Sequence, residues 1–357
     1  MFGMSNTIQT PYFVMYEKKL IHNLKKLNEL EEKANIHILH TVKSFNQDTV
    51  LPIISAKLSG MSVTSPKELD IAKKANAKKV HLYAPAFKEE VLKEMIPNIS
   101  TLSLNSLTQW QKFLSLPVSK GLRINPKLSL AIPTHCNPNL NSSRLGVDFV
   151  DFLDIYHDNK SQFEELEGLH FHALFQDKTE GLSLLLEHIV KYYQKVLPQL
   201  KWINLGGGHN FTDANYDVNN FVKLLDNFQT KYPNIKLYFE PGETVTKGCG
   251  DFMTTVLDIV VTEDIEVAIL DTSIETHLLD VAIVNQSLQV KNTQKKVTPY
   301  FYELSGNSCL QGDLIGKYYF TEPLQIGDTI VFEDMMPYTM VKMTEFNGME
   351  KARFYLQ

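Results

Sequence analysis

Short apolar runs that alternate with helix-like segments constrain the fold of this chain more than any other feature. A strand-like run begins at Tyr12, leucines at helical spacing follow it, and further apolar runs recur as far as residue 239. Strand–helix alternation predicts a parallel sheet, and eight repeats suit a closed barrel better than an open doubly wound sheet. The expected barrel strands are 36–42, 61–63, 80–83, 102–104, 121–124, 169–174, 202–205 and 237–239.

The sequence pattern changes after about Gly250, where closely spaced β-rich runs replace the alternation of strands and helices. We therefore expect an α/β protein, with a (β/α)8 TIM-like barrel followed by a mainly β domain. The expected domains are an N-terminal strand segment at 1–16 that packs with the β domain, a barrel at 17–250, and a β-rich domain at 251–357. The expected β runs are 252–261, 266–271, 281–290, 297–304, 316–320 and 328–333.

Composition narrows the class of protein. The chain has 357 residues, of which 43% are hydrophobic and 21% charged, as in ordinary soluble globular proteins. No basic leader or bilayer-length apolar stretch is evident, so we expect a cytoplasmic protein. A net charge of −6 does not support nucleic-acid binding and would mildly attract a cationic small molecule. Cys136, Cys249 and Cys309 are odd in number and widely spaced, which fits neither a disulfide framework nor a zinc site, and no metal is expected.

Two strand ends carry residues suited to holding an aldehyde and a phosphate. Lys43 ends the first expected barrel strand, in ILHTVKSF. A desolvated lysine has a depressed pKa and can form an imine, although a lysine here can also be a solvated charge. Gly206, Gly207 and Gly208 follow a later strand, where backbone N–H groups could bind a phosphate. The alternative is a tight strand-to-helix turn.

Two further strand ends carry a carboxylate and an imidazole. Glu240 opens EPGE directly after a strand, and beside a pyridine nitrogen it would keep that nitrogen protonated. It could instead be a surface charge. His172 in GLHFHALF shares a strand face with His170. Each could be a core histidine, but two on one face indicate a polar cavity.

The β-rich region adds two candidates. Cys309, in SGNSCLQGD, lies on an expected loop, where a thiol whose pKa is near neutrality can donate a proton. By itself such a cysteine is more often inert. Tyr338, in DMMPYT, could equally be a core aromatic residue.

Seven motifs occur in one order along nearly the whole chain: TPYFVMY, VKSF, GLHFHALF, LGGG, EPGE, GNSCLQGD and DMMPYT. Together they resemble the fold-type III pyridoxal-phosphate decarboxylases, the alanine-racemase-like group that includes ornithine and diaminopimelate decarboxylases. The resemblance implies pyridoxal 5'-phosphate as cofactor. It implies that Lys43 carries the cofactor, His172 stacks on its ring, Gly206 to Gly208 hold its phosphate, Glu240 binds its pyridine nitrogen and Tyr338 reaches the phosphate region.

The resemblance also implies a head-to-tail homodimer with shared active sites. Cys309 and Asp313 of one subunit would complete the site of the other, with Cys309 protonating the substrate carbon after carbon dioxide leaves. The β-rich domain would then contribute to both the active site and the dimer.

Two departures from the ornithine and diaminopimelate enzymes bear on the substrate. Glu243 replaces the arginine usual after EPG, and Leu310 replaces the aspartate usual after the cysteine. The patterns EPGE and CLxGD, with LDTSIETHLLDV, are similar to the carboxynorspermidine decarboxylase group of polyamine and spermidine biosynthesis, which also accepts carboxyspermidine. Such long cationic substrates need carboxylates along the cleft, and the candidates are Glu243, Asp280 and Asp313.

Several alternatives remain open from sequence. Asp271 and His277 could lie near the substrate, or be a strand-end cap and a surface imidazole. The enzyme could decarboxylate diaminopimelate, ornithine or lysine, or be an amino-acid racemase, a non-catalytic pyridoxal-phosphate carrier, or an unrelated phosphate-binding barrel. The Cys309 loop and EPGE argue against a racemase, and the β-rich region after Gly250 argues against a carrier.

Overall fold

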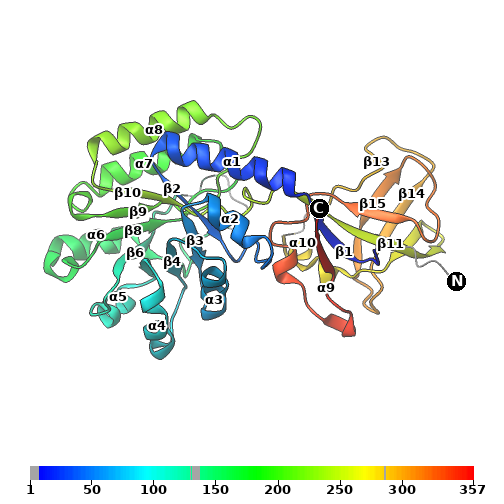
Figure 1. Ribbon diagram of the computed structural model, residues 1–357, viewed down its shortest axis with the longest axis horizontal. Coiled ribbons are helices and arrows are strands. Elements are labelled where there is room, and N and C mark those ends of the chain that lie inside the picture. The colour runs from blue at the N-terminus through cyan, green and yellow to red at the C-terminus, as the bar shows by residue number, and fades with distance from the viewer. Residues whose placement is uncertain (1–7, 129, 131–136, 285–286) are drawn as a thin grey trace. The chain divides into compact units, whose positions relative to one another are not determined.

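The chain forms two compact units in the computed structural model, which describes residues 8–128, 130, 137–284 and 287–357. Cys136 lies outside the described residues. The barrel unit is His22–Val245, and the sheet unit combines the chain up to Ile21 with Thr246–Gln357 (Figure 1). The first division between units falls inside helix α1 (Glu17–Ala34), so this helix belongs to both.

The strands of the barrel unit are parallel and close on themselves, because β5 pairs with β6 at the two ends of the strand order. The short β7 (Val147–Asp148) is added beside β6. Closure confirms the expected barrel and its eight expected strands. These strands are β2 (His37–Thr41), β3 (Gly60–Val63), β4 (Val80–Tyr83), β5 (Thr101–Leu104), β6 (Ser119–Asn125), β8 (Gly168–Phe171), β9 (Trp202–Asn204) and β10 (Lys236–Phe239).

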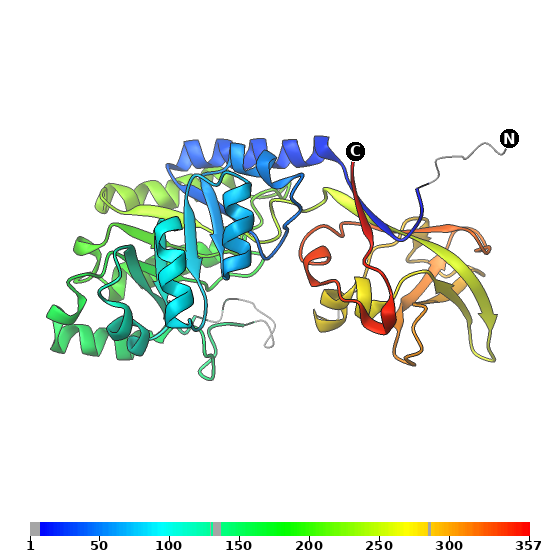
Figure 2. The ribbon, with the colours of Figure 1, turned by 60° about the horizontal axis from the view of Figure 1, so that its bottom comes forward.

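Helices surround these strands, as Figure 2 shows. The start of α3 illustrates the local cause: the side chain of Ser65 accepts a hydrogen bond from the backbone N–H of Glu68 at 3.3 Å, the cap expected from this spacing. Among the described residues, no helix is long and apolar enough to cross a membrane. The remaining helices are α2 (Leu51–Lys57), α3 (Pro66–Lys74), α4 (Glu89–Met95), α5 (Leu107–Phe113), α6 (Phe149–Asp158), α7 (Glu180–Tyr192) and α8 (Val218–Lys231).

One tryptophan fills the barrel where β6, β8 and β9 run side by side. A Cβ on Gly168 would come within 2.0 Å of the Trp202 ring, and a Cβ on Gly121 within 2.8 Å. The indole N–H donates to the Ser119 hydroxyl at 2.9 Å, so the buried polar atom has a partner. Glycine is therefore required at these positions to give the indole its space.

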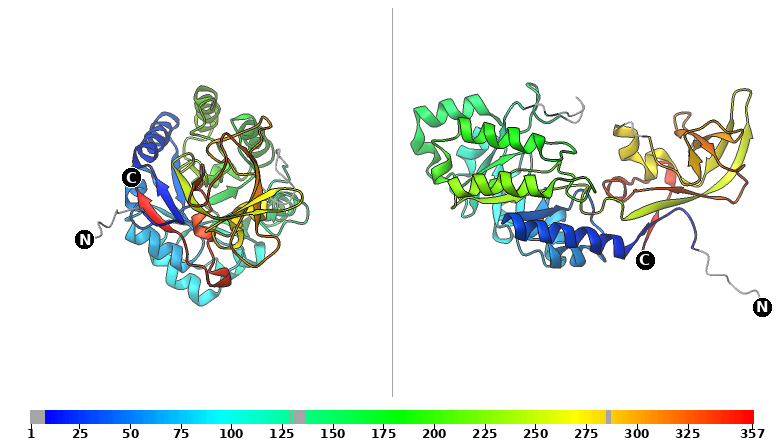
Figure 3. Two further views of the ribbon diagram at one scale, coloured as in Figure 1. Left: turned by 90° about the vertical axis from the view of Figure 1, so that its right-hand side faces the viewer. Right: turned by 90° about the horizontal axis from the view of Figure 1, so that it is seen from above.

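The sheet unit is a curled sheet organised on the long β11 (Figure 3). The N-terminal β1 lies between β11 and β17, which ties both ends of the chain into this unit. The mainly β domain expected from sequence is confirmed. Its strands are β1 (Tyr12–Met15), β11 (Gly250–Val261), β12 (Glu266–Leu270), β13 (Thr293–Gln294), β14 (Phe301–Ser305), β15 (Leu314–Phe320), β16 (Thr329–Phe332) and β17 (Arg353–Leu356).

One expected β run is wrong. The run expected at 281–290 instead begins within helix α10 (Leu279–Val284), which follows the short α9 (Ile274–His277). Leu278 and Val281 are buried while Ile283 is exposed. Burial of residues three apart suits a helix, whereas a strand would bury alternate residues. The apolar composition of the run hid this helical spacing.

Gly168→Ala is expected to destabilise the barrel by about 1–3 kcal/mol, since the new methyl group overpacks the space of the Trp202 ring. Urea unfolding of the full chain measures the change. Combining Gly168→Ala with Trp202→Ala is expected to cost less than the sum of the two single changes, because the clash is then gone. Strict additivity would contradict the packing argument.

Candidate cofactor site

Lys43 lies just past β2, at the barrel rim to which the carboxyl ends of all the parallel strands lead. The Thr41 hydroxyl donates to the Pro241 carbonyl at 3.3 Å, which ties this strand end to the one after β10. The Lys43 side chain is open to solvent, yet barrel atoms crowd it on the other sides. This desolvation lowers the pKa of the Lys43 amine, partly opposed by Glu240 and reinforced by Arg123. An amine of this kind is suited to forming an imine.

The glycine turn lies against His172. Gly206 and Gly208 have φ of 70° and 89°, and a Cβ on either would meet backbone oxygens, so only glycine fits without strain. Gly206 N–H donates to the Asn204 side chain and Gly207 N–H donates to His172 Nδ1 at 3.0 Å. These two N–H groups are therefore engaged within the barrel, and the phosphate role of Gly206 to Gly208 stays a prediction.

His172 is held as a neutral ring. Burial lowers the pKa of His172 well below its usual value, and the charges of Arg123 and Lys43 add to this. Because Nδ1 accepts from Gly207, the ring proton is on Nε2. A neutral, oriented imidazole can lie against an aromatic ring, although its stacking on a cofactor stays a prediction.

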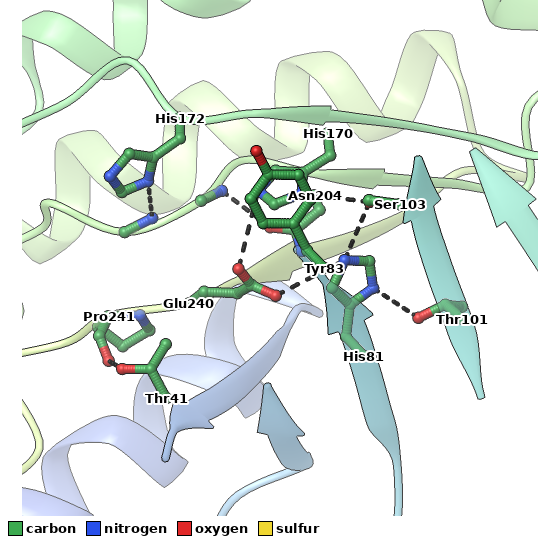
Figure 4. Close-up of polar contacts among 12 residues, drawn as sticks. Thr41, His81, Tyr83, Thr101, Ser103, His170, His172, Asn204, Glu240 and Pro241 are labelled. Atoms are coloured by element: carbon green, nitrogen blue, oxygen red, sulfur yellow. Dashed lines mark hydrogen bonds and ion pairs between the residues drawn. The ribbon is translucent and has the colours of Figure 1, made fainter. Parts of the chain in front are cut away.

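Glu240 faces two buried histidines (Figure 4). His81 Nε2 lies 3.8 Å from Glu240 Oε1, and His170 Nε2 lies 3.7 Å from Oε2. The carboxylate is only 10% exposed, and Oε1 has no hydrogen-bond partner among the described residues. The structure thus places Glu240 inside the barrel rather than on the surface, with an acceptor left over for a ligand.

Arg123, Tyr83 and Asn105 are site residues that the sequence prediction missed. The buried Arg123 guanidinium lies 4.6 Å from the centre of the Tyr83 ring, and the Tyr83 hydroxyl donates to Asn105 at 2.8 Å. A charged residue within the apolar run 121–124 was the available signal, because such a residue must find compensation inside the barrel.

Cys309 is exposed on the loop between β14 and β15 of the sheet unit. Buried Asp313 organises this loop: its carboxylate accepts from the N–H of Ser308 at 2.9 Å and from the N–H of Ile274 at 2.8 Å. Asp313 therefore shapes the loop that presents the thiol. Its contact with a substrate stays a prediction, as does proton donation by Cys309.

Asp280 lies in the first turn of α10 and accepts a hydrogen bond from the Thr339 hydroxyl at 3.1 Å. Its other oxygen, Oδ1, is buried without a hydrogen-bond partner among the described residues, and burial raises the pKa of this carboxyl. A bound cation would satisfy that oxygen. Tyr338 directly precedes Thr339 in sequence and has a φ of 65°, and the Lys342 amine lies 5.3 Å from the centre of the Tyr338 ring.

Asp271 and His277 have structural partners. Asp271 accepts from the backbone N–H of Thr255 at 2.8 Å and from the Thr10 hydroxyl at 2.5 Å, as a strand-end cap would. His277 is buried, with Nε2 donating to the Glu350 carbonyl at 2.9 Å. A surface imidazole is therefore the wrong description of His277.

The barrel residues fit an aldehyde cofactor with a basic ring nitrogen. They supply a desolvated amine at Lys43, a neutral imidazole at His172 and an unpartnered carboxylate oxygen at Glu240. Across the described ranges, no group of three or more His, Cys, Asp or Glu residues could hold a metal ion.

Family comparison agrees with this site. Residues 61–336 match the model of the pyridoxal-dependent decarboxylases, described by their C-terminal sheet domain. The chain belongs to this family. It is thus a carboxy-lyase that uses pyridoxal phosphate.

Two relatives and one solved structure are similar to this chain over most of its length. The chain is 37% identical to a carboxynorspermidine/carboxyspermidine decarboxylase of Campylobacter jejuni, over 98% of this chain and 93% of the relative. It is 34% identical to a carboxyaminopropylagmatine decarboxylase of Synechocystis, over 96% and 88%. A crystal structure of the Campylobacter jejuni carboxynorspermidine decarboxylase with norspermidine is similar at a TM-score of 0.88, with 35% identity, covering 98% and 94% of the two chains.

Proposed function

We propose that the enzyme decarboxylates carboxynorspermidine and carboxyspermidine, giving norspermidine and spermidine in polyamine biosynthesis. The observation that carries this proposal is 37% identity, over 98% of the chain, to a relative with that activity. Asp280 adds support, because its buried oxygen, which has no hydrogen-bond partner in the described part of the chain, is suited to an ammonium group. Glu243 and Asp313 complete the proposed set of substrate carboxylates. A cytoplasmic location stays a prediction.

We propose these roles for the site residues. When bound, pyridoxal phosphate would accept the electron pair that decarboxylation leaves on the substrate. Lys43 would hold the cofactor until the substrate amine replaces it, His172 would lie against one face of the ring, and Gly206 to Gly208 would bind the phosphate together with Tyr338. Glu240 would accept a hydrogen bond from the ring nitrogen. Cys309 delivers its Sγ proton to the substrate α-carbon.

We also propose a homodimer in which each active site takes Cys309 from the partner subunit. The thiol is exposed on a loop held by Asp313, so it is available to a second chain. The Lys43 amine is likewise open to solvent in its own barrel. Two such complementary features on one chain suit a two-fold assembly with two identical sites.

Borohydride reduction is expected to fix the cofactor on Lys43 and to remove the visible absorbance of the protein. Peptide mass spectrometry checks the attachment, with Lys79 as an internal control because it is another lysine whose pKa is lowered by burial. Lys43→Ala is expected to abolish turnover while retaining noncovalent cofactor. A modified peptide that lacks Lys43 would refute the assignment.

Mixing inactive Lys43→Ala and Cys309→Ala dimers is expected to restore roughly a quarter of wild-type activity, because random exchange makes half of the dimers hybrids with one intact site each. Turnover is measured after native mass spectrometry confirms exchange. Mixing Lys43→Ala with Lys43→Ala/Cys309→Ala is the control and should remain inactive. Failure of the first mixture to recover activity would exclude a shared site.

Glu243→Gln and Asp280→Asn are each expected to raise KM for carboxynorspermidine by about tenfold, with a smaller effect on kcat, because a distal ammonium contact is made in both ground and transition states. Steady-state kinetics measure both constants. Asp264→Asn, a change at an exposed carboxylate of the sheet unit, is the control for Asp280→Asn and should leave KM unchanged.

The substrate panel for the wild-type enzyme contains carboxynorspermidine, carboxyspermidine, carboxyaminopropylagmatine, ornithine, lysine and meso-diaminopimelate. We expect kcat/KM to be highest for the first two. Faster turnover of carboxyaminopropylagmatine would instead assign this enzyme the substrate named for the Synechocystis relative. Equal turnover of ornithine, lysine or diaminopimelate would exclude the polyamine assignment.

A further inference from the structure

A line of hydrogen-bonding side chains from barrel strands β4, β5 and β8 ends at Glu240 (Figure 4). His81 Nδ1 lies 2.7 Å from the Thr101 hydroxyl, and His81 Nε2 lies 3.0 Å from the Ser103 hydroxyl. Ser103 Oγ in turn lies 3.2 Å from His170 Nδ1. His81, Ser103 and His170 are all at most 2% exposed, so water does not supply alternative partners.

Both histidines in this line are neutral. Burial lowers the pKa of His81 against the opposing effect of Glu240. Burial also lowers the pKa of His170 well below its usual value, reinforced by Arg123 and by the other cationic or basic groups that face it. These groups are His81, His172 and Lys43. Each neutral ring therefore has one N–H donor and one nitrogen acceptor.

The Glu240 carboxylate determines which nitrogen of each histidine ring carries the proton. Each histidine turns its Nε2 toward the carboxylate, at 3.8 Å for His81 and 3.7 Å for His170. A nitrogen lone pair aimed at a carboxylate would repel it, whereas an N–H attracts it. Both protons therefore belong on Nε2, and both Nδ1 atoms must accept.

The two hydroxyl groups complete this arrangement. Thr101 donates to His81 Nδ1, and Ser103 donates to His170 Nδ1. His81 Nε2–H then donates to Ser103 Oγ and also faces the Glu240 carboxylate, 3.8 Å away. Each Nδ1 then has a hydroxyl donor, and His170 Nε2–H faces Glu240 Oε2 at 3.7 Å. The opposite order would aim lone pairs at the carboxylate.

We propose that Thr101, His81, Ser103 and His170 form a proton-ordered chain of hydrogen bonds that fixes both histidines as Nε2–H tautomers and thereby positions the Glu240 carboxylate. The proposal rests on the proposed function of Glu240 as the partner of the cofactor ring nitrogen. His81 and His170 are positioning residues, because they act on the cofactor through Glu240. The proton-ordered chain presents N–H groups to the carboxylate inside the barrel.

Histidine tautomers in the full-length protein test the chain directly. Protein labelled with ¹⁵N-histidine, with and without pyridoxal phosphate, is examined by long-range ¹H–¹⁵N correlation spectra that distinguish Nε2–H, Nδ1–H and charged rings. His81→Gln and His170→Gln serve only to assign the two signals. We expect both rings to be neutral Nε2–H tautomers near neutral pH. A charged ring, or an Nδ1–H tautomer in either ring, would overturn the proposal.

Thr101 supplies a matched pair of variants at a half-exposed position away from the carboxylate. Thr101→Val keeps the shape and removes the donor, whereas Thr101→Ser keeps the donor. We expect Thr101→Val to introduce a second His81 tautomer and to weaken pyridoxal phosphate binding on the order of fivefold, the loss of one weak hydrogen bond. Thr101→Ser should behave as wild type in both measurements.

The two proposals can fail separately. If Thr101→Val and Thr101→Ser match in tautomer and affinity, the ordered chain is excluded even when borohydride attaches the cofactor to Lys43. If the tautomers are as expected but no cofactor becomes attached to Lys43, the proton-ordered chain of hydrogen bonds is supported. Its proposed role in cofactor binding is then refuted.

Discussion

Closure of a parallel sheet is the constraint on which the rest of the molecule depends. All barrel strands run in one direction and β5 meets β6, so the carboxyl ends of strands far apart in sequence reach one rim. Lys43 and Glu240 are nearly two hundred residues apart, yet their strands β2 and β10 are neighbours. The hydrogen bond from Thr41 to Pro241 joins the two strand ends at that point.

The polar interior of the barrel is an exception that its surroundings have to stabilise. Arg123, Glu240 and a set of histidines lie among fully buried apolar strands. The guanidinium lies over Tyr83, and His81 and His170 bond to hydroxyl groups on β5. Because a half-satisfied polar network is costly, these contacts stabilise the buried polar groups.

The sequence predicted the barrel well because its signal is periodic and local. It missed the helix at 279–284, because a short apolar run with buried residues three apart is ambiguous between helix and strand. The surface-imidazole alternative for His277 was wrong for another reason: burial of an imidazole depends on packing against distant residues such as Glu350, which no local pattern reveals.

The same difference between local patterns and distant packing decides which site residues the sequence could predict. Those that follow strands, such as Lys43 and Glu240, were visible from sequence because strand ends are predictable. Those within strands, such as His81, Ser103 and Arg123, became meaningful only when closure brought their faces together. A polar residue inside an apolar run signals that compensation exists, but its partner lies on a strand that sequence spacing cannot identify.

The openness of Lys43 has a consequence for the chain before its cofactor arrives. Its amine has a lowered pKa and is also open to solvent, so it is nucleophilic and reachable at once. Small metabolic aldehydes can reach such an amine as readily as the cofactor can. In a chain without cofactor, pyridoxal phosphate and other aldehydes therefore compete to form an imine with Lys43. A higher concentration of the cofactor favours the correct imine over these adducts.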